Sequence, residues 1–256
     1  KEVDYNPLTY LQASYKKLNS KAYREFAQEN DVGFVDGFIG YIGYDMVKAF
    51  EPKLRPAMEQ LDDVTKAPDL DLMRPKLIIA FSHKKSILTL ISEVKSMQDK
   101  FSDIEKLLKC SFASSPLIPA KPLGEAKFTF SKEQFFEKVD NGKEMIRSGD
   151  VFQLLISNRL IQPAKVDRFS FYRILRTKNP SPYLFLLEYD KFAIAGSSPE
   201  VMVRLSDGQI LLRPIAGTRR RGNTRARDKA YEEEMLGDAK EVAEHIMLVD
   251  IGRNDV

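Results

Sequence analysis

Two glutamates near the C-terminal end of the sequence have the spacing of a cation site. Glu241 and Glu244 are three residues apart, so on a helix both carboxylates lie on one face, about one turn from each other. Carboxylate oxygens are the ligands that Mg²⁺ takes in proteins. A structural interpretation remains open, because Asp238 and Glu241 also have the spacing of a helix-capping pair. The apolar Ile246 and Val249 favour a helix whose carboxylates border a buried space.

A Gly-Thr pair and an arginine-rich stretch precede this helix. Gly217 and Thr218 offer backbone N–H groups and a hydroxyl to an anionic ligand, although two residues are weak evidence. Residues 213–227 contain six arginines. A nucleic-acid surface is one interpretation, but no aromatic side chains are interleaved with them. Ion pairing with acidic neighbours is the stronger interpretation.

Glu200 follows Gly-Ser-Ser-Pro in a turn that we expect between two strands. A carboxyl group at such a turn is usually exposed. When it is pressed against an apolar pocket, its pKa rises and the protonated group can act as a general acid. The pattern alone favours the exposed carboxylate.

Length and composition indicate a globular protein. The 256 residues are 43% hydrophobic, which is enough for one large core or two smaller ones. The net charge of +3 is too small to indicate a nucleic-acid or membrane partner. The single cysteine, Cys110, excludes an internal disulfide and fits a reducing compartment. Without a long apolar run or the apolar core of a signal peptide, we expect a cytoplasmic protein.

The order of the expected elements is that of an α+β protein. Helices are expected at residues 1–30, 45–50, 97–108, 131–147, 169–175 and from 238 onward, with a capping box at Ser131 and Gln134. Strands are expected at 33–44, 76–81, 86–92 and 151–161, followed by a meander of 183–189, 192–195, 201–205 and 209–212 with a turn at Asp207-Gly208. Residues 51–75 are expected to be irregular. A proline-containing linker at about 111–124 separates an N-terminal subdomain, 1–115, from a second domain, 125–256.

Several segments, in order, resemble the chorismate-utilising enzymes, and within that family the anthranilate-forming members. The resemblance covers almost all of the chain and rests on residues 37–45 (Gly-Phe-Ile-Gly-Tyr-Ile-Gly-Tyr-Asp), 149–153 (Gly-Asp-Val-Phe-Gln), 179–183 (Asn-Pro-Ser-Pro-Tyr), 213–218 (Arg-Pro-Ile-Ala-Gly-Thr) and 241–255. It implies a sandwich of two stacked antiparallel β-sheets flanked by helices. The chain stops at Val256 directly after a helix, so we expect this fold to be incomplete at the C-terminus and the chain to be truncated at both ends.

The resemblance also implies roles for the residues discussed above. Glu244 would be a direct Mg²⁺ ligand, with Glu241 supporting it directly or through water, and the metal would hold the ring carboxylate of chorismate. Gly217 and Thr218 would contact the substrate. Glu200 would protonate the C4 hydroxyl as it leaves, ammonia would add at C2, and loss of pyruvate would give anthranilate for tryptophan biosynthesis.

Two positions distinguish the branches of this family. Relatives that make aminodeoxychorismate carry a nucleophilic lysine where this chain has Ala216, in the substrate-binding segment. Relatives that add water carry a lysine base at the catalytic position that Gln153 occupies here. The resemblance therefore implies ammonia as the nucleophile. Aminodeoxychorismate formation and a non-catalytic module of the same fold are the alternatives.

Partners follow from the same resemblance. A glutamine amidotransferase subunit would supply the ammonia, and neither nucleic acid nor a membrane is expected. Asn179, Pro182, Tyr183 and Leu184 match half of the site where these relatives bind L-tryptophan as a feedback inhibitor, and the other half, a Leu-Leu-Glu-Ser segment, is absent from this sequence. A second pair of Mg²⁺-binding glutamates is absent too, so we expect this chain to be inactive alone.

Overall fold

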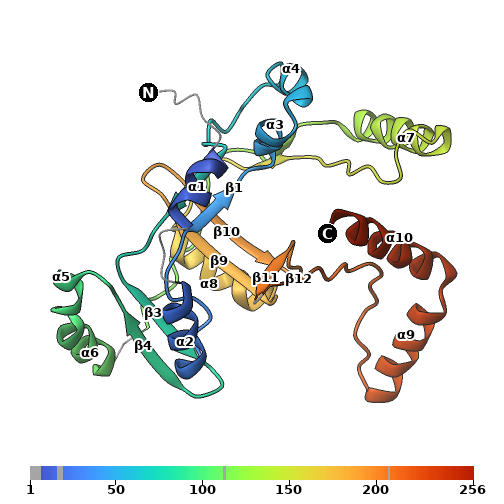
Figure 1. Cartoon of the computed structure of the whole chain (residues 1–256). Coiled ribbons are helices and arrows are strands. Elements are labelled where there is room, and N and C mark those ends of the chain that lie inside the picture. The colour runs from blue at the N-terminus through green and yellow to red at the C-terminus, as the bar shows by residue number, and fades with distance from the viewer. Residues whose placement is uncertain (1–6, 16–19, 112–113, 207) are drawn as a thin grey trace. The chain divides into compact units, whose positions relative to one another are not determined.

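The structure, a computed structural model, describes residues 7–15, 20–111, 114–206 and 208–256. The chain consists of two compact units, residues 1–114 and 115–256, which are described separately below (Figure 1). The predicted linker, 111–124, spans this division, although the predicted domain bounds stay predictions. The predicted turn residue Asp207, linker residues 112–113, and residues 1–6 and 16–19 of the first predicted helix lie outside the described residues.

The N-terminal unit contains short helices and two antiparallel strand pairs. β1 (Ile39–Ile42) pairs with β2 (Leu70–Met73), and β3 (Ile78–Ser82) pairs with β4 (Ile87–Ile91), which confirms the predicted hairpin. Its helices are α1 (Pro7–Tyr15), α2 (Ser20–Asn30), η1 (Tyr44–Met46), α3 (Val47–Phe50), η2 (Pro52–Leu54), α4 (Arg55–Met58), α5 (Lys95–Gln98) and α6 (Phe101–Lys109).

Strand β2 corrects the prediction that residues 51–75 are irregular. Its four residues are surrounded by polar residues and prolines, so the local pattern hid them, and the strand exists because β1 lies beside it. The glycines of β1 permit this approach: a Cβ on Gly40 would lie 2.0 Å from the backbone oxygen of Asp71. This observation confirms the prediction that another backbone comes close to the glycine-rich segment.

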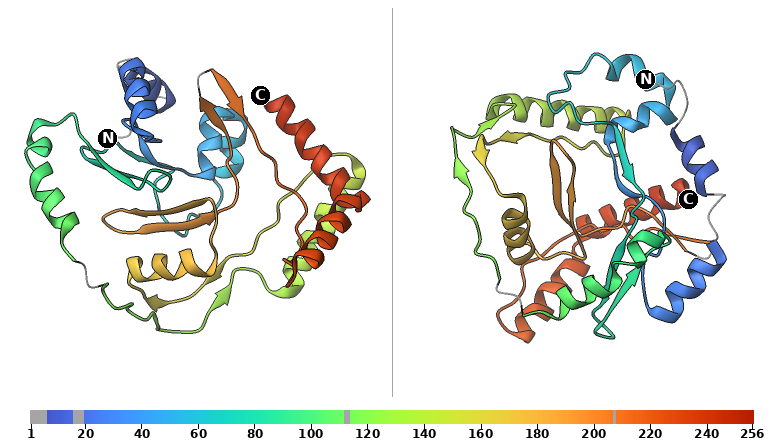
Figure 2. Two further views of the ribbon diagram at one scale, coloured as in Figure 1. Left: turned by 90° about the horizontal axis from the view of Figure 1, so that it is seen from below. Right: turned by 90° about the vertical axis from the view of Figure 1, so that its left-hand side faces the viewer.

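The C-terminal unit begins with the long helix α7 (Lys132–Ser148), and the predicted capping box is confirmed. The Ser131 hydroxyl accepts the N–H of Gln134, whose side chain in turn accepts the N–H of Ser131. Gly149 ends the helix with a φ of 83°, in the left-handed region that favours glycine. Helix α8 (Arg168–Lys178) ends before Asn179-Pro180, as predicted, and lies against strands β9 (Tyr183–Glu188) and β10 (Ala193–Ser198) (Figure 2).

Antiparallel pairing continues through this unit, which confirms the α+β class. The pairs are β5 (Lys121–Pro122) with β8 (Ala164–Lys165), β6 (Lys127–Phe128) with β7 (Leu160–Ile161), β9 with β10, and β11 (Arg204–Ser206) with β12 (Gln209–Leu211). All sheets among the described residues are two-stranded. β10 and β11 do not pair there, so the predicted continuous meander is wrong at that step.

The predicted strand 151–161 is also largely wrong. Only Leu160 and Ile161 form a ladder, and residues 151–159 have no strand assigned. A run of β-forming residues becomes a strand only when another strand accepts its backbone hydrogen bonds. Among the described residues, β6 supplies such a partner at the C-terminal end of this run alone.

Apolar side chains remain accessible on many elements. Val32 and Met46 are the buried apolar residues among those described, with exposures of 8% and 6%, whereas Phe81 on β3 is 53% exposed. The described residues therefore do not enclose the large core that composition permits. Among them, no helix combines the length and the apolar character needed to span a membrane.

Two helices end the chain (Figure 1). α9 (Arg225–Gly237) leads into α10 (Ala239–Asp255) through Asp238, whose side chain accepts the backbone N–H groups of Lys240 and Glu241. The predicted start of the final helix is thus confirmed. The predicted burial of its apolar face is not observed, because Ile246 is 61% exposed in the described chain.

Candidate active site

Glu200 lies against the Pro-Ile-Ala-Gly-Thr segment. It follows β10, and its carboxylate oxygen Oε1 accepts the backbone N–H of Ile215 at 3.1 Å. The Ser198 hydroxyl donates to the backbone oxygen of Glu200 at 3.1 Å, which holds the turn that carries it. The residue itself is exposed in the described chain. The structure therefore joins the predicted general acid to the segment that carries Ala216, Gly217 and Thr218.

Glu241, on α10, also lies against this segment. A Cβ on Gly217 would lie 2.3 Å from Oε2 of Glu241, so only a glycine leaves room for this carboxylate in its present position. The other oxygen, Oε1, accepts a hydrogen bond from Arg219 at 3.0 Å. Glu200 is hydrogen-bonded to Ile215 and Glu241 lies beside Gly217, so the two carboxylates meet points of one segment that are at most about 7 Å apart along the chain.

Glu244 lies one helical turn beyond Glu241 on α10 and is exposed. Two carboxylates at this spacing suit Mg²⁺, which is usually bound through one or two carboxylates together with waters and substrate oxygens. The donor set therefore fits part of a Mg²⁺ site. In the described part of the chain, no group of three or more His, Cys, Asp or Glu side chains is arranged to hold a metal.

Two of the six arginines in the arginine-rich stretch form ion pairs with acidic neighbours, which agrees with its stronger interpretation. Arg219 contacts Glu241, and Arg221 binds Asp228 of α9 through two nitrogens. Sequence reasoning did not single out Arg219 as a neighbour of the site. Its position one residue after Thr218 was the available signal.

Asp228, in the first turn of α9, should make the stability of the fold depend on pH. Hydrogen bonds from Arg221 first, and then from the Gly222 N–H, lower its pKa from the usual 3.8 to about 2. Because the folded-state pKa is depressed, the ionised carboxylate stabilises the fold above pH 3.8, and this stabilisation is lost as pH falls towards 2.

The Asp228→Asn variant should therefore lose less stability than the wild type between pH 4 and pH 2, because it has no carboxylate to protonate. Thermal unfolding by circular dichroism at a series of pH values measures this difference. Asp250→Asn on α10 is the matched control, since Asp250 pairs with Arg253 on its own helix. Identical acid profiles for wild type and Asp228→Asn would contradict the assignment.

The remaining predicted site residues lie apart from these contacts. Gln153 is exposed in the irregular segment 151–159. Asn179 caps the end of α8, and its backbone oxygen accepts the Ser197 hydroxyl. Tyr183 and Leu184 then open β9 opposite Ser198 and Ser197, which fixes the proline turn, with Pro182, against β10.

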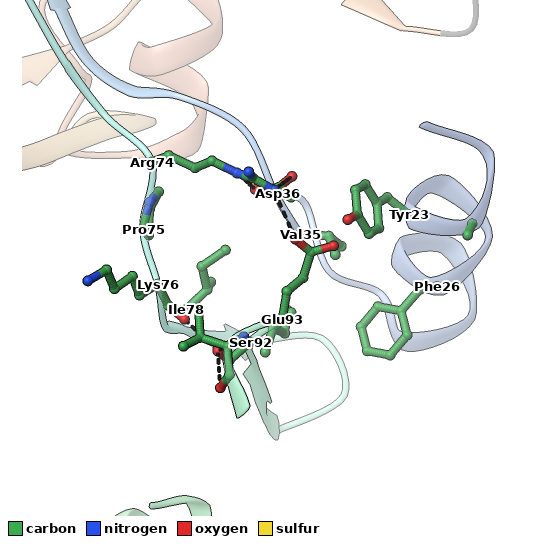
Figure 3. Close-up of a pocket in the computed structure, with 13 residues that line it drawn as sticks. Tyr23, Phe26, Val35, Asp36, Arg74, Pro75, Lys76, Ile78, Ser92 and Glu93 are labelled. Atoms are coloured by element: carbon green, nitrogen blue, oxygen red, sulfur yellow. Dashed lines mark hydrogen bonds and ion pairs between the residues drawn. The ribbon is translucent and has the colours of Figure 1, made fainter. Parts of the chain in front are cut away.

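A pocket of about 550 Å³ in the N-terminal unit contains none of the predicted site residues. Tyr23 and Phe26 of α2 line one side, and Arg74 extends towards Asp36 at the rim (Figure 3). Arg74 binds Asp36 through two nitrogens at 2.7 Å each and Glu93 at 2.9 Å. Arg74 pairs with both carboxylates at this rim, and Lys76 also lines the pocket, so the formal charges of the lining sum to zero.

Comparisons with known proteins show the family of this chain. The family described as chorismate binding enzyme matches residues 5–256. The chain is 38% identical to anthranilate synthase component 1 of Lactococcus lactis, over 99% of this chain and 55% of that protein. It is 41% identical to the protein of the same name from Acinetobacter calcoaceticus, over 87% of this chain and 47% of that protein.

A solved structure has a similar fold. Anthranilate synthase component I from Streptococcus pneumoniae matches with a TM-score of 0.77 and 29% identity, covering 99% of this chain and 55% of that one. The chain spans about half the length of the relatives that it matches. The family match over nearly all residues establishes that this chain belongs to the chorismate binding enzymes.

Proposed function

We propose that the protein carrying this chain is the large subunit of an anthranilate synthase, which converts chorismate and ammonia to anthranilate and pyruvate. The names of the relatives support this proposal. The observation that carries it is the convergence of Glu200 and Glu241 on residues 215–218, through the Ile215 N–H and the Gly217 backbone. The proposal assigns the proton donor and a cation ligand to these two glutamates, and residues 215–218 would contact the substrate.

Glu200 would act as the general acid. A bond forms between ammonia nitrogen and C2 while the C4–O bond breaks, and hydroxide is a poor leaving group. A proton from Glu200 converts the departing hydroxide to water. The Ile215 N–H holds one carboxyl oxygen at 3.1 Å, which fixes the orientation of the group while the other oxygen carries the proton. The ammonium group formed at C2 would give up a proton, and transfer of the C2 proton to the enolpyruvyl methylene with cleavage of the C3–O bond would then release pyruvate and form the aromatic ring.

Glu244 and Glu241 would hold Mg²⁺, which supplies positive charge for the ring carboxylate of the substrate. The backbone of Gly217 and Thr218 would line the substrate beside them. Ala216 has no nucleophilic group, so the lysine adduct of the aminodeoxychorismate-forming relatives has no counterpart here. Gln153 is uncharged and does not serve as a base for water.

Three further assignments belong to the same proposal. The protein would receive ammonia from a glutamine amidotransferase subunit, which fits the "component 1" in the names of its relatives. L-Tryptophan would bind at Asn179 and residues 182–184 as a feedback inhibitor. The protein would be cytoplasmic, which its exposed free thiol at Cys110 suits, because a reducing compartment preserves such a group.

Product identification tests the reaction. The full-length protein is mixed with chorismate and Mg²⁺, with or without an ammonium salt, and products are separated by chromatography with fluorescence detection. We expect anthranilate and pyruvate in equal amounts, and only when ammonium is present. Aminodeoxychorismate as the end product, or a hydroxylated product without ammonium, would move the protein to another branch of the family. An absence of chorismate consumption would favour a non-catalytic module.

A further inference from the structure

One arginine beside the candidate site binds three carboxylates. From Nε, Arg219 donates to Glu234 of α9 at 3.1 Å. Its two terminal nitrogens donate at 3.0 Å to Glu241 in the first turn of α10 and to Asp238, the N-cap of that helix. Nη1 also donates at 3.0 Å to the backbone oxygen of Thr218. The guanidinium thus links both C-terminal helices to the substrate-binding segment.

This arrangement is more enclosed than an ordinary surface ion pair. The side chains of Arg219 and Glu241 are 23% and 21% exposed, so solvent screens their interaction less than it screens a fully exposed pair. The hydrogen bond that Arg219 donates to Glu241 is the largest cause of the raised pKa of Arg219, which stays charged. Three carboxylates share one guanidinium, so the cluster keeps a net negative charge.

We propose that Arg219 is a positioning residue that makes cation binding at Glu241 and Glu244 depend on bound chorismate. The inference rests on the proposed function. Arg219 donates a hydrogen bond to Oε1 of Glu241 at 3.0 Å. Oε2 of the same carboxylate lies close to Gly217, which has no side chain to block it. A divalent cation that binds this carboxylate meets the guanidinium as a neighbouring like charge, and its affinity for the empty site is reduced.

Chorismate should weaken this effect of Arg219 on cation affinity, because it brings two carboxylates. These carboxylates would compete with Glu241 for the guanidinium and so free Oε1 of Glu241 for the cation, which then binds more tightly when the substrate is present. By linkage, the cation strengthens chorismate binding by the same factor. A site of this kind stays largely free of metal until its substrate arrives, which keeps Glu241 and Glu244 from taking up cations unproductively.

The Arg219→Gln variant tests the proposal by metal binding rather than by turnover. Mn²⁺ serves as the probe, and free Mn²⁺ is measured by electron paramagnetic resonance with and without chorismate, in the absence of ammonia. We expect Mn²⁺ to bind the chorismate-free variant about 10-fold more tightly than the wild type, within the usual 5- to 150-fold range of coupling between sites. The enhancement of Mn²⁺ affinity by chorismate should fall by a similar factor.

Two variants separate this role from a structural one. Arg219→Lys keeps the charge and should retain most of the chorismate enhancement, although it loses the planar fork. Arg221→Gln removes an equal charge two residues away, from a side chain that binds Asp228 instead of Glu241. It should leave Mn²⁺ affinity unchanged, both with and without chorismate. Thermal unfolding of each variant confirms that it is folded.

Glu234→Gln keeps the test decisive if Arg219→Gln does not fold. Glu234 is 60% exposed and shares the guanidinium with Glu241, so its loss makes the cluster less negative and leaves Arg219 more firmly bound to Glu241. Chorismate-free Mn²⁺ affinity should fall, and more than in Glu232→Gln, a control on the same helix.

The outcomes distinguish this inference from the proposed function. Unchanged chorismate enhancement in Arg219→Gln, or Mn²⁺ affinity reduced equally with and without chorismate, would overturn the positioning role alone. If the wild type forms no anthranilate and binds no Mn²⁺ in either condition, the proposed function itself fails.

Discussion

Replacing Glu200 with glutamine should abolish most anthranilate formation with ammonium as the nitrogen source. The amide keeps the size of the side chain and can still accept the Ile215 N–H, which Oε1 of Glu200 accepts at 3.1 Å. It cannot donate a proton to the departing C4 hydroxyl. We expect kcat to fall by about 10²- to 10⁴-fold, the usual contribution of general acid catalysis. Chorismate affinity should change little, because the proton is transferred only in the transition state.

Steady-state kinetics and equilibrium chorismate binding measure the two effects separately. Glu188→Gln is the matched control, because Glu188 is exposed and pairs with Ala193, at the end of β10 farthest from Glu200. Turnover of Glu200→Gln close to that of Glu188→Gln would remove Glu200 from the mechanism. Equal losses of chorismate affinity and turnover would instead indicate a binding role.

Replacing Glu244 with glutamine should cause the second large loss, in Mg²⁺ affinity and therefore in activity. A neutral amide oxygen is a poorer ligand for a hard cation than a carboxylate. We expect a loss of affinity greater than the roughly 10- to 100-fold that follows removal of a group supporting a metal ligand. Glu241→Gln should lose less, because Glu241 is proposed as the supporting carboxylate and shares its charge with Arg219 at 3.0 Å.

Titration calorimetry with Mg²⁺ in the presence of chorismate, without ammonia, measures these affinities. Asp250→Asn removes a carboxylate from the same helix and should leave Mg²⁺ affinity unchanged, because Asp250 pairs with Arg253. Wild-type affinity in Glu244→Gln would contradict its role as a ligand. A larger loss in Glu241→Gln than in Glu244→Gln would exchange the two roles.

Local sequence signals predicted the elements that depend on local contacts. The capping box at Ser131 and the end of α8 before Asn179-Pro180 both follow from interactions within a few residues. The hairpin of β3 and β4 also needs only a short connection. Strand β2 and the irregular course of residues 151–159 could not be predicted in this way, since each depends on whether a distant strand lies alongside.

The candidate site also combines features that local sequence patterns predict with features that they do not predict. The spacing of Glu241 and Glu244 on one helix is a local property, and α10 realises it. The contact of Glu200 with the Ile215 N–H and the approach of Glu241 to Gly217 join residues 15 and 24 positions apart, and no local pattern encodes them. The arginine cluster suggested ion pairs, but the choice of Glu241 as a partner of Arg219 required the structure.

The most direct test of the account is the metal dependence of the ammonia reaction in the full-length protein. Anthranilate fluorescence is followed with chorismate and an ammonium salt, after metal removal by EDTA and during titration back with Mg²⁺. We expect that EDTA abolishes anthranilate formation and that excess Mg²⁺ restores it in wild type but not in Glu244→Gln at the same concentration. Anthranilate formation that persists in EDTA at the wild-type rate would contradict a cation site at Glu241 and Glu244.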